Sequence, residues 1–160
     1  MTDNYQPING RNEYETALRQ LLAMAEQEIR VFDPDLSNGG WQRKDVAELL
    51  QSFLARGRNN SLTLILHDKN FVQQHCPRLL PLLQMHAHKV RLLLTTADAQ
   101  HLRDSFVLVD KLHSLRRFHQ DHDRAALELH AKETANILQQ RFAELLEASN
   151  PDTLSPPLGL

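Results

Sequence analysis

Three short segments that are almost free of polar residues constrain the fold of this chain more than any other feature. The segments SLTLILHD (61–68), VRLLLTT (90–96) and DSFVLVD (104–110) lack the alternation of polar and apolar residues that marks a half-exposed strand. Each apolar run is shorter than a core helix, so we predict strands that are buried on both faces. Strands of this kind need a covering layer on each side of their sheet.

Apolar residues at helical spacing separate these strands. Four helices are predicted, within 12–28, within 41–57, from residue 70 onward, and within 127–149. Two further strands are predicted at 28–34 and 113–118. Pro77 and Pro81 interrupt the third helix, because each proline removes a backbone donor. We therefore expect a break in this helix, or two short helices.

The resulting order of elements is α-β-α-β-α-β-β-β-α. It indicates an α/β fold with a mixed, largely parallel sheet and helices on both faces. Residues 12–148 are expected to form one domain, since 160 residues with 41% hydrophobic side chains suit a single core. We expect a flexible N-terminus at 1–11 and a flexible, proline-rich tail at 149–160.

The charge and the cysteine content of the chain limit its partners and its location. The formal net charge is −2, so any binding of nucleic acid or anionic membrane has to come from a local patch. No run approaches the ~20 apolar residues that a membrane span needs. Cys76 is the single cysteine of the sequence and has no partner for an internal disulfide. Together with the lack of an apolar signal core, this indicates a cytoplasmic protein.

The sequence lacks the motifs of several common enzymes and cofactor sites. It has no glycine-rich phosphate loop, no Rossmann fingerprint and no Gly-x-Ser-x-Gly nucleophile motif. Its nine histidines raise the question of a metal site, and HQDHD (119–123) and HAH (86–88) contain several of them. Neither segment has the three or four ordered ligands of a zinc site. We therefore predict solvated histidines, with no metal and no cofactor.

A single aspartate, Asp110, closes the strand DSFVLVD, and a turn at Lys111 leads to the basic strand 113–118. This arrangement resembles the phospholipase D superfamily, in which one strand carries His-x-Lys-x-x-x-x-Asp. The order of strand, loop, helix ending in Arg-Gly and strand over residues 28–68 is also similar, and the likeness spans 12–148. In that superfamily the histidine is the nucleophile, the lysine holds the phosphate and the aspartate closes the strand.

Comparison with this motif, residue by residue, implies that catalysis has been lost. With Asp110 as the motif aspartate, Ser105 occupies the lysine position and Arg103 the nucleophile position. A shifted frame makes His101 an alternative nucleophile, but the motif aspartate is then missing. The resemblance therefore implies a degenerate single half of the superfamily fold. Asp110 is expected to be structural and to accept backbone hydrogen bonds in the turn at Lys111.

Four basic residues are the candidate ligand-binding groups: Arg103, Lys111, Arg116 and Arg117. One hypothesis places them on an anion-binding surface that is left from the ancestral pocket. Because side chains alternate along a strand, Arg116 and Arg117 are expected to point to opposite faces of the sheet. The alternative is an ordinary solvated edge strand that is protected by its charges.

These observations support three hypotheses of function. The first is a non-catalytic module that binds a protein partner or a phosphate-bearing ligand; here the resemblance implies a homodimer with its interface near Asp110. The second is a divergent, metal-independent phosphodiesterase or nuclease that uses His101 and Arg103. The third is nucleic-acid binding through the strand with Arg116 and Arg117, which predicts an affinity that falls with salt.

Overall fold

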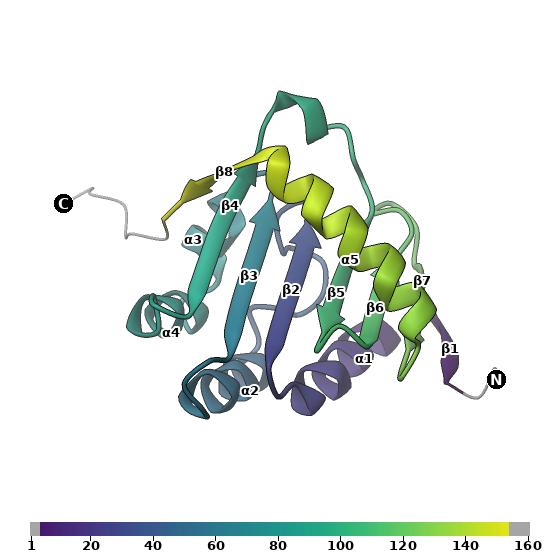
Figure 1. The fold of residues 1–160 in the computed structure, drawn as a ribbon, viewed down its shortest axis with the longest axis horizontal. Helices are drawn as coiled ribbons and strands as arrows, with labels where there is room; N and C mark the ends of the chain where they lie inside the picture. Colours follow the sequence, from purple (N-terminus) through teal and green to yellow (C-terminus); the bar gives the residue numbers. More distant parts are fainter. Residues whose placement is uncertain (1–3, 154–160) are drawn as a thin grey trace.

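The computed structural model describes residues 4–153 and shows a mixed sheet with helices on both faces (Figure 1). The described residues form eight strands in the order β1-β7-β6-β5-β2-β3-β4-β8. The strands are β1 (Tyr5–Asn9), β2 (Glu28–Asp33), β3 (Ser61–Leu66), β4 (Val90–Thr95), β5 (Ser105–Val109), β6 (His113–Arg117), β7 (Arg124–Glu128) and β8 (Ser149–Asp152). The predicted fold class, a mixed sheet between helical layers, is confirmed.

One face of the sheet is covered by more helices than the other. They are α1 (Arg11–Met24), α2 (Lys44–Ala55), α3 (Asn70–His75), α4 (Leu79–Met85), α5 (Lys132–Glu147) and the 3-10 turn η1 (Ala97–Ala99). Helices α1 to α4 lie on one face, and α5 crosses the other face in front of β5 and β6 (Figure 1). Pro77 separates α3 from α4, which confirms the predicted break. Pro81 lies in the first turn of α4, where its missing N–H has no helical partner to lose.

Alternate residues of the central strands feed two separate hydrophobic clusters. On β2, Val31 joins the cluster under α1 and α2, while its neighbour Phe32 joins the cluster under α5. Leu64 and Ile65 of β3 divide between the two clusters in the same way. This division explains why the sequence shows no polar alternation in these strands, since both faces are covered.

The strand directions correct one part of the sequence interpretation. Within the described residues, only the β2–β3 and β3–β4 pairs are parallel, and the other five pairs are antiparallel. The expectation of a largely parallel sheet is therefore wrong. Three strands were not predicted, and all of them pair antiparallel. A parallel addition needs a long crossover, whereas β6 and β7 are joined by a short loop.

The unpredicted strands also change the expected domain limits. Residues 5–9, which were assigned to a flexible N-terminus, form β1 beside β7, and 149–152 of the expected tail form β8 beside β4. Strand β7 begins at Arg124, between the predicted strand 113–118 and the predicted helix within 127–149, where no element was expected. The edge strands β1 and β8 are short and polar and lack a hydrophobic run that would reveal them. The remaining parts of the expected flexible ends, 1–3 and 154–160, lie outside the described residues.

Three strand ends meet at the end of the sheet to which β2 points. Strand β2 ends at Asp33, and its antiparallel neighbour β5 begins at Ser105. Ser105 is in turn the cross-strand partner of Arg117, the last residue of β6. Directly opposite residues of an antiparallel pair have side chains within contact distance. The topology therefore brings an aspartate, a serine and an arginine from distant parts of the sequence together.

Candidate ligand-binding pocket

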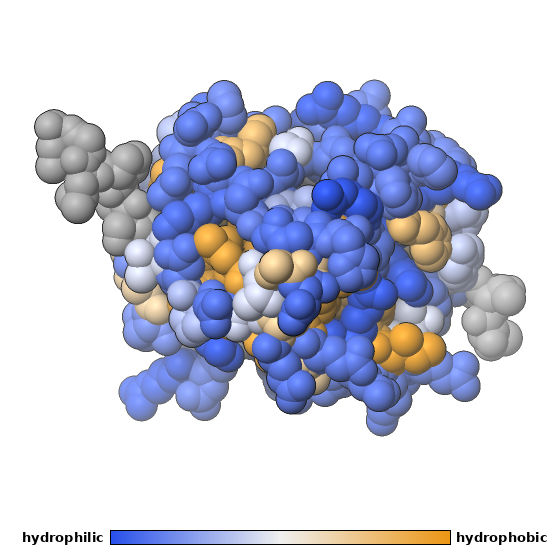
Figure 2. All heavy atoms as spheres, turned by 90° about the horizontal axis from the view of Figure 1, so that it is seen from above, coloured by the Kyte–Doolittle hydropathy of each residue, from blue (hydrophilic) through white to orange (hydrophobic). Residues whose placement is uncertain are grey.

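A small polar pocket opens at the end of the sheet to which β2 points, between the β2–α2 loop and the β6–β7 loop. Its volume is about 210 Å³, and it is lined by Asp33, Pro34, Asp35, Ser37, Asn38, Ser105, Arg117, Gln120 and Asp121. Figure 2 shows the molecule from this side: hydrophilic residues cover most of the surface, and the hydrophobic spots are small and separate. The surroundings of the pocket therefore suit a polar ligand better than an apolar partner.

Arg117 is the one basic side chain among the described residues that line the pocket. It is only 6% exposed, and its guanidinium carbon lies over the Tyr14 ring, 3.9 Å from the ring centroid. Its Nη1 donates a hydrogen bond of 2.6 Å to the backbone oxygen of Asn38. Its Nε and Nη2 donate to no residue within 4–153, so they are available to a ligand in the pocket.

Asp33 brings a buried carboxylate to the same pocket. It is 4% exposed, and its Oδ2 accepts hydrogen bonds from the backbone N–H of Asp35 at 3.0 Å and of Leu36 at 2.6 Å. These bonds form a turn that holds Leu36 at a φ of 68°. Burial raises the pKa of Asp33 to about 6, although the two N–H groups and Arg117 favour the ionised form. We therefore expect Asp33 to gain a proton in mild acid.

Two buried hydroxyl groups lie beside these charged groups: Ser105, which lines the pocket, and Tyr14, whose ring lies against the Arg117 guanidinium. Both side chains are buried, and burial raises the pKa of Tyr14 to about 12, so the phenol is neutral. Ser105 Oγ lies beside the Tyr14 hydroxyl but lacks a hydrogen bond of normal geometry to any described residue. A buried hydroxyl without a full partner is costly unless a ligand or water satisfies it.

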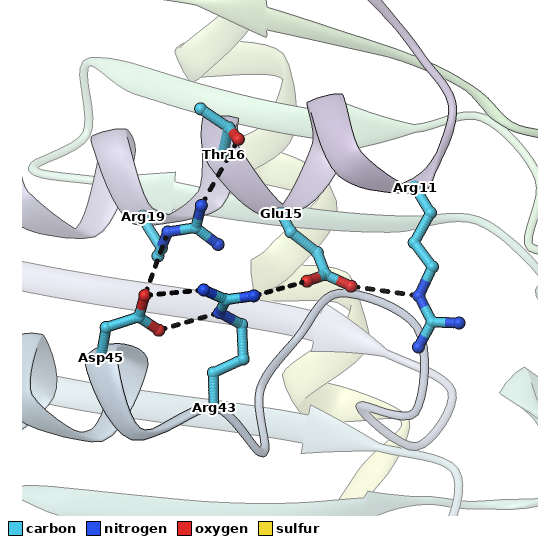
Figure 3. A network of polar contacts seen from close by, with 6 residues as sticks. All are labelled: Arg11, Glu15, Thr16, Arg19, Arg43 and Asp45. Atoms are coloured by element: carbon cyan, nitrogen blue, oxygen red, sulfur yellow. Dashed lines mark hydrogen bonds and ion pairs between the residues drawn. The ribbon is translucent and has the colours of Figure 1, made fainter.

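A network of ion pairs fixes the β2–α2 loop against α1 (Figure 3). Arg43 lies between two carboxylates, with Nη1 3.4 Å from Glu15 Oε1 and Nε 2.9 Å from Asp45 Oδ1. Arg19 of α1 also contacts Asp45, at 3.4 Å. Gly40 allows the close approach, because it has a φ of 80° and a Cβ there would lie 2.9 Å from Glu15 Cδ. The network holds the loop that supplies four residues of the pocket lining.

The other basic residues singled out in the sequence lie outside the pocket. Arg103 is exposed, and its Nη1 donates to the backbone oxygens of Gln100 at 2.7 Å and Leu102 at 3.1 Å. Lys111 is exposed in the turn at the opposite end of the sheet, and His101 is exposed before β5. None of these three residues lines the pocket, and Arg116 does not line it either. Among the four basic candidates, the structure therefore places Arg117 alone there.

Arg116 and Arg117 point to opposite faces of the sheet, as the strand period requires. The guanidinium carbon of Arg116 lies 5.2 Å from the ring centroid of Phe118, whereas Arg117 contacts Tyr14 on the α1 side. The two arginines therefore cannot act together on one small ligand.

Asp110 lies at the opposite end of the sheet from the pocket. Its carboxylate accepts three backbone hydrogen bonds, from Glu26 at 3.0 Å, Gln27 at 2.7 Å and Glu28 at 2.9 Å. These donors belong to the connection between α1 and β2, and not to the turn at Lys111 where we expected them. Asp110 and Lys111 themselves have φ values of 55° and 57°. The carboxylate thus fastens the β5–β6 turn to the start of β2.

Sequence reasoning missed Asp33 and Tyr14, although a signal for one of them was present. Asp33 ends the predicted strand 28–34 directly before a proline, and ligands of open α/β sheets bind beyond the carboxyl ends of strands. Tyr14 gave no comparable signal, because its position in a helical pattern indicates only a core residue.

Among residues 4–153, no group of three or more histidine, cysteine, aspartate or glutamate side chains is arranged to hold a metal ion. Within the same part of the chain, no helix combines the length and the apolar character that crossing a membrane requires.

Known structures share this fold. Nuc from Salmonella typhimurium, described as a phospholipase D family member, is 11% identical over 92% of this chain and 97% of its own, with a TM-score of 0.68. NucT from Helicobacter pylori is 14% identical over 92% of this chain and 98% of its own, with a TM-score of 0.57. At such low identities the likeness shows the fold alone, which is that of the phospholipase D superfamily.

A third structure has the same fold within a longer chain. TrmBL2, an archaeal chromatin protein described as having a novel mode of DNA binding, is 12% identical, with a TM-score of 0.63 over 94% of this chain and 55% of its own. No curated protein sequence matches the chain significantly. Residues 10–155 match the family model described as a domain of unknown function, DUF7931, and the chain therefore belongs to this family.

Proposed function

We propose that this chain is a phospholipase D-like module that binds a phosphate-bearing ligand in the pocket and does not cleave it. The observation that supports the proposal is the identity of the residues at the two motif positions. Ser105 stands in the pocket where the motif has its lysine, and Arg103, at the nucleophile position, is held outside by two backbone oxygens. A binding site is retained in this arrangement, but its nucleophile is not.

Cleavage of a phosphodiester by the superfamily's route needs a nucleophile within reach of the phosphorus and a cation beside it. The lining of the pocket contains no histidine, lysine or cysteine among the described residues. Its one hydroxyl at a motif position, Ser105, has no general base within hydrogen-bond distance. The divergent phosphodiesterase that uses His101 is therefore the weaker proposal, because His101 does not line the pocket.

The pocket has donors for an anion and also charges that oppose it. Arg117 Nε and Nη2 and the Ser105 hydroxyl are the groups that would meet phosphate oxygens. Asp33, Asp35 and Asp121 line the same space and repel an anion while they are ionised. Since Asp33 is the buried one, its protonation would remove the largest opposing charge. We therefore expect weak anion binding at neutral pH and tighter binding in mild acid.

Calorimetric titration with sulfate tests this proposal, because sulfate, unlike phosphate, keeps its charge between pH 5.0 and 7.5. We expect saturable binding that is about three- to tenfold tighter at the lower pH. Arg117→Gln should abolish it, and Arg103→Gln, a matched change of an exposed arginine outside the pocket, should not affect it. Asp33→Asn should bind sulfate at pH 7.5 as tightly as the wild type does at pH 5.0, a gain that a misfolded variant would not show.

Two results would contradict the proposal. Equal binding by wild type and Arg117→Gln would place the anion elsewhere. Hydrolysis of bis-p-nitrophenyl phosphate that is lost on His101→Ala would favour the phosphodiesterase instead. The homodimer with an interface near Asp110 and the protein partner stay predictions, and light scattering at micromolar concentration tests the homodimer.

A further inference from the structure

A groove separate from the pocket lies at the β1 edge of the sheet. Its volume is about 580 Å³, and it is lined by Tyr5, Pro7, Ile8, Asn9, Phe118, His122, Arg124 and Ala125. Two of these are the most exposed aromatic residues of the described chain: Tyr5 is 48% and Phe118 49% exposed. Aromatic rings that leave half of their surface in water at the wall of a groove are available for stacking by a ligand.

The charges of the groove differ from those of the pocket. Arg124 is the cation of its lining, His122 lies in the same lining, and no carboxylate is among the described residues that line it. Arg116 lies over the ring of Phe118, with its guanidinium carbon 5.2 Å from the centroid. A cation on one side of an aromatic ring leaves the other side free for a second planar group. The groove therefore presents rings beside positive charge, which suits an anion that also has planar groups.

One short loop connects this groove to the pocket. In the segment 118–123 between β6 and β7, Phe118 and His122 line the groove, while Gln120 and Asp121 line the pocket. A ligand with its phosphate beside Arg117 would thus need only to pass over this loop to reach the rings. Repeated phosphates joined to planar groups are the chemistry of nucleic acid.

We propose that the groove binds single-stranded nucleic acid through stacking of its bases on Phe118 and Tyr5. The proposal rests on the proposed function, since it names the ligand whose phosphate the pocket would take. A single strand is favoured over a duplex, because paired bases are stacked on one another and do not offer free faces to side chains. Arg116 and Arg124 add contacts to the backbone that do not depend on sequence.

Fluorescence anisotropy at low salt tests the proposal with two labelled 12-nucleotide probes, oligothymidylate and an abasic strand of the same length. We expect oligothymidylate to bind more tightly, because only it has bases to stack. Phe118→Ala should weaken it about five- to 150-fold, which corresponds to the loss of one base–aromatic stack. Phe118→Leu should lose nearly as much, since leucine keeps apolar area but has no ring face. Ile137→Ala, at a position 63% exposed on α5, is the matched control and should change nothing.

Equal affinity for the two probes, or an unchanged affinity of Phe118→Ala, would overturn the stacking proposal. Preference for a duplex of the same sequence would do so as well. Sulfate titration of the same proteins separates this failure from failure of the proposed function. Sulfate binding that needs Arg117, without binding of oligothymidylate, would retain the pocket and reject nucleic acid. Oligothymidylate binding that needs Phe118 but not Arg117 would retain the groove and reject the pocket as its phosphate site.

Discussion

Each end of the sheet has an aspartate at the end of a strand, Asp33 buried and Asp110 half-buried, and the surroundings give the two carboxylates different uses. Asp110 meets three backbone N–H groups from a neighbouring connection. Asp33 meets two from its own loop and otherwise faces a pocket with an arginine. Burial raises the pKa of Asp33 to about 6, whereas the three backbone donors of Asp110 fasten the β5–β6 turn to the start of β2. Asp110 thus stabilises the fold, whereas Asp33 lies in the pocket for which we propose a ligand.

Removal of the Asp110 carboxylate should have the largest effect on stability. Asp110→Ala leaves three N–H groups without their acceptor and puts alanine at a φ of 55°, so we expect a loss of about 2–4 kcal/mol in the free energy of unfolding. Urea unfolding followed by circular dichroism measures it. Asp110→Asn is the matched control, because asparagine tolerates this φ and keeps one acceptor oxygen; its loss should be smaller. A loss under about 0.5 kcal/mol in Asp110→Ala would show that the carboxylate does not fasten the turn.

Asp33→Asn should raise the free energy of unfolding, whereas Asp110→Asn should lower it. Because its folded-state pKa lies above its ordinary value of 3.8, the stability due to protonated Asp33 is complete below pH 3.8 and is lost as the pH rises through about 6. Asp33→Asn keeps an acceptor for the two N–H groups and removes the charge. We expect it to stabilise the protein at pH 7 by about 1–3 kcal/mol, and not at all near pH 3.5.

Paired urea unfolding of Asp33→Asn and Asp110→Asn at pH 7 gives the sharpest form of this comparison. Opposite signs would support the assignment of one carboxylate to a ligand and the other to the fold. Destabilisation by Asp33→Asn at pH 7 would mean that its charge is needed by Arg117 in the folded chain.

His113 makes the Asp110 end sensitive to acid. Burial lowers its pKa and nearby His130 lowers it further, while Asp110 acts in the other direction. The stability that depends on neutral His113 is therefore complete above pH 6.5 and is lost as the pH falls through the lower folded-state value. Its Nδ1 accepts a 3.0 Å hydrogen bond from the His130 N–H, which the protonated ring cannot accept. His113→Gln can replace this acceptor without titrating, so its unfolding free energy should fall less than that of the wild type between pH 7 and 5.

Unfolding of Asp33→Asn and of the double variant Asp33→Asn/His113→Gln separates the two titrations, which act in opposite directions over this pH range. The difference between these two proteins should grow as the pH falls. An equal dependence on pH in both would exclude His113 as the acid-sensitive group.

A feature could be predicted from the sequence where the residues that determine it are close together in the chain. The buried strands and the break between α3 and α4 are local: a run such as 61–66 and a proline such as Pro77 determine them within a few residues. Strands β1 and β8 depend on a partner strand more than 50 residues away, and YQPIN and SNPD contain nothing apolar enough to indicate it.

The pocket was predictable only in part, for the same reason. The motif comparison located Ser105 in sequence, the group of basic residues on the next strand included Arg117, and strand period separated Arg117 from Arg116. Neither the motif nor the strand period could show that Arg103 would turn to the oxygens of Gln100 and Leu102, since rotamer choice at a strand start depends on nearby backbone. The donors of Asp110 were likewise predicted in the adjacent turn, but come from residues 26–28 across the sheet.

The ion-pair network of Figure 3 should have the smallest effect on stability and still matter for the pocket end. Glu15→Gln removes the charge that Arg11 and Arg43 share, at 3.1 and 3.4 Å, but Arg43 keeps Asp45 at 2.9 Å. Glu15 itself is 12% exposed, but both arginine partners are exposed, so we expect a loss of about 1 kcal/mol in urea unfolding. The loop that Arg43 holds supplies Asn38, whose carbonyl positions Arg117, so sulfate affinity should fall about two- to threefold. A change in stability without a change in sulfate affinity would mean that the loop is held by its own turn at Asp33, and that the network serves the fold as Asp110 does.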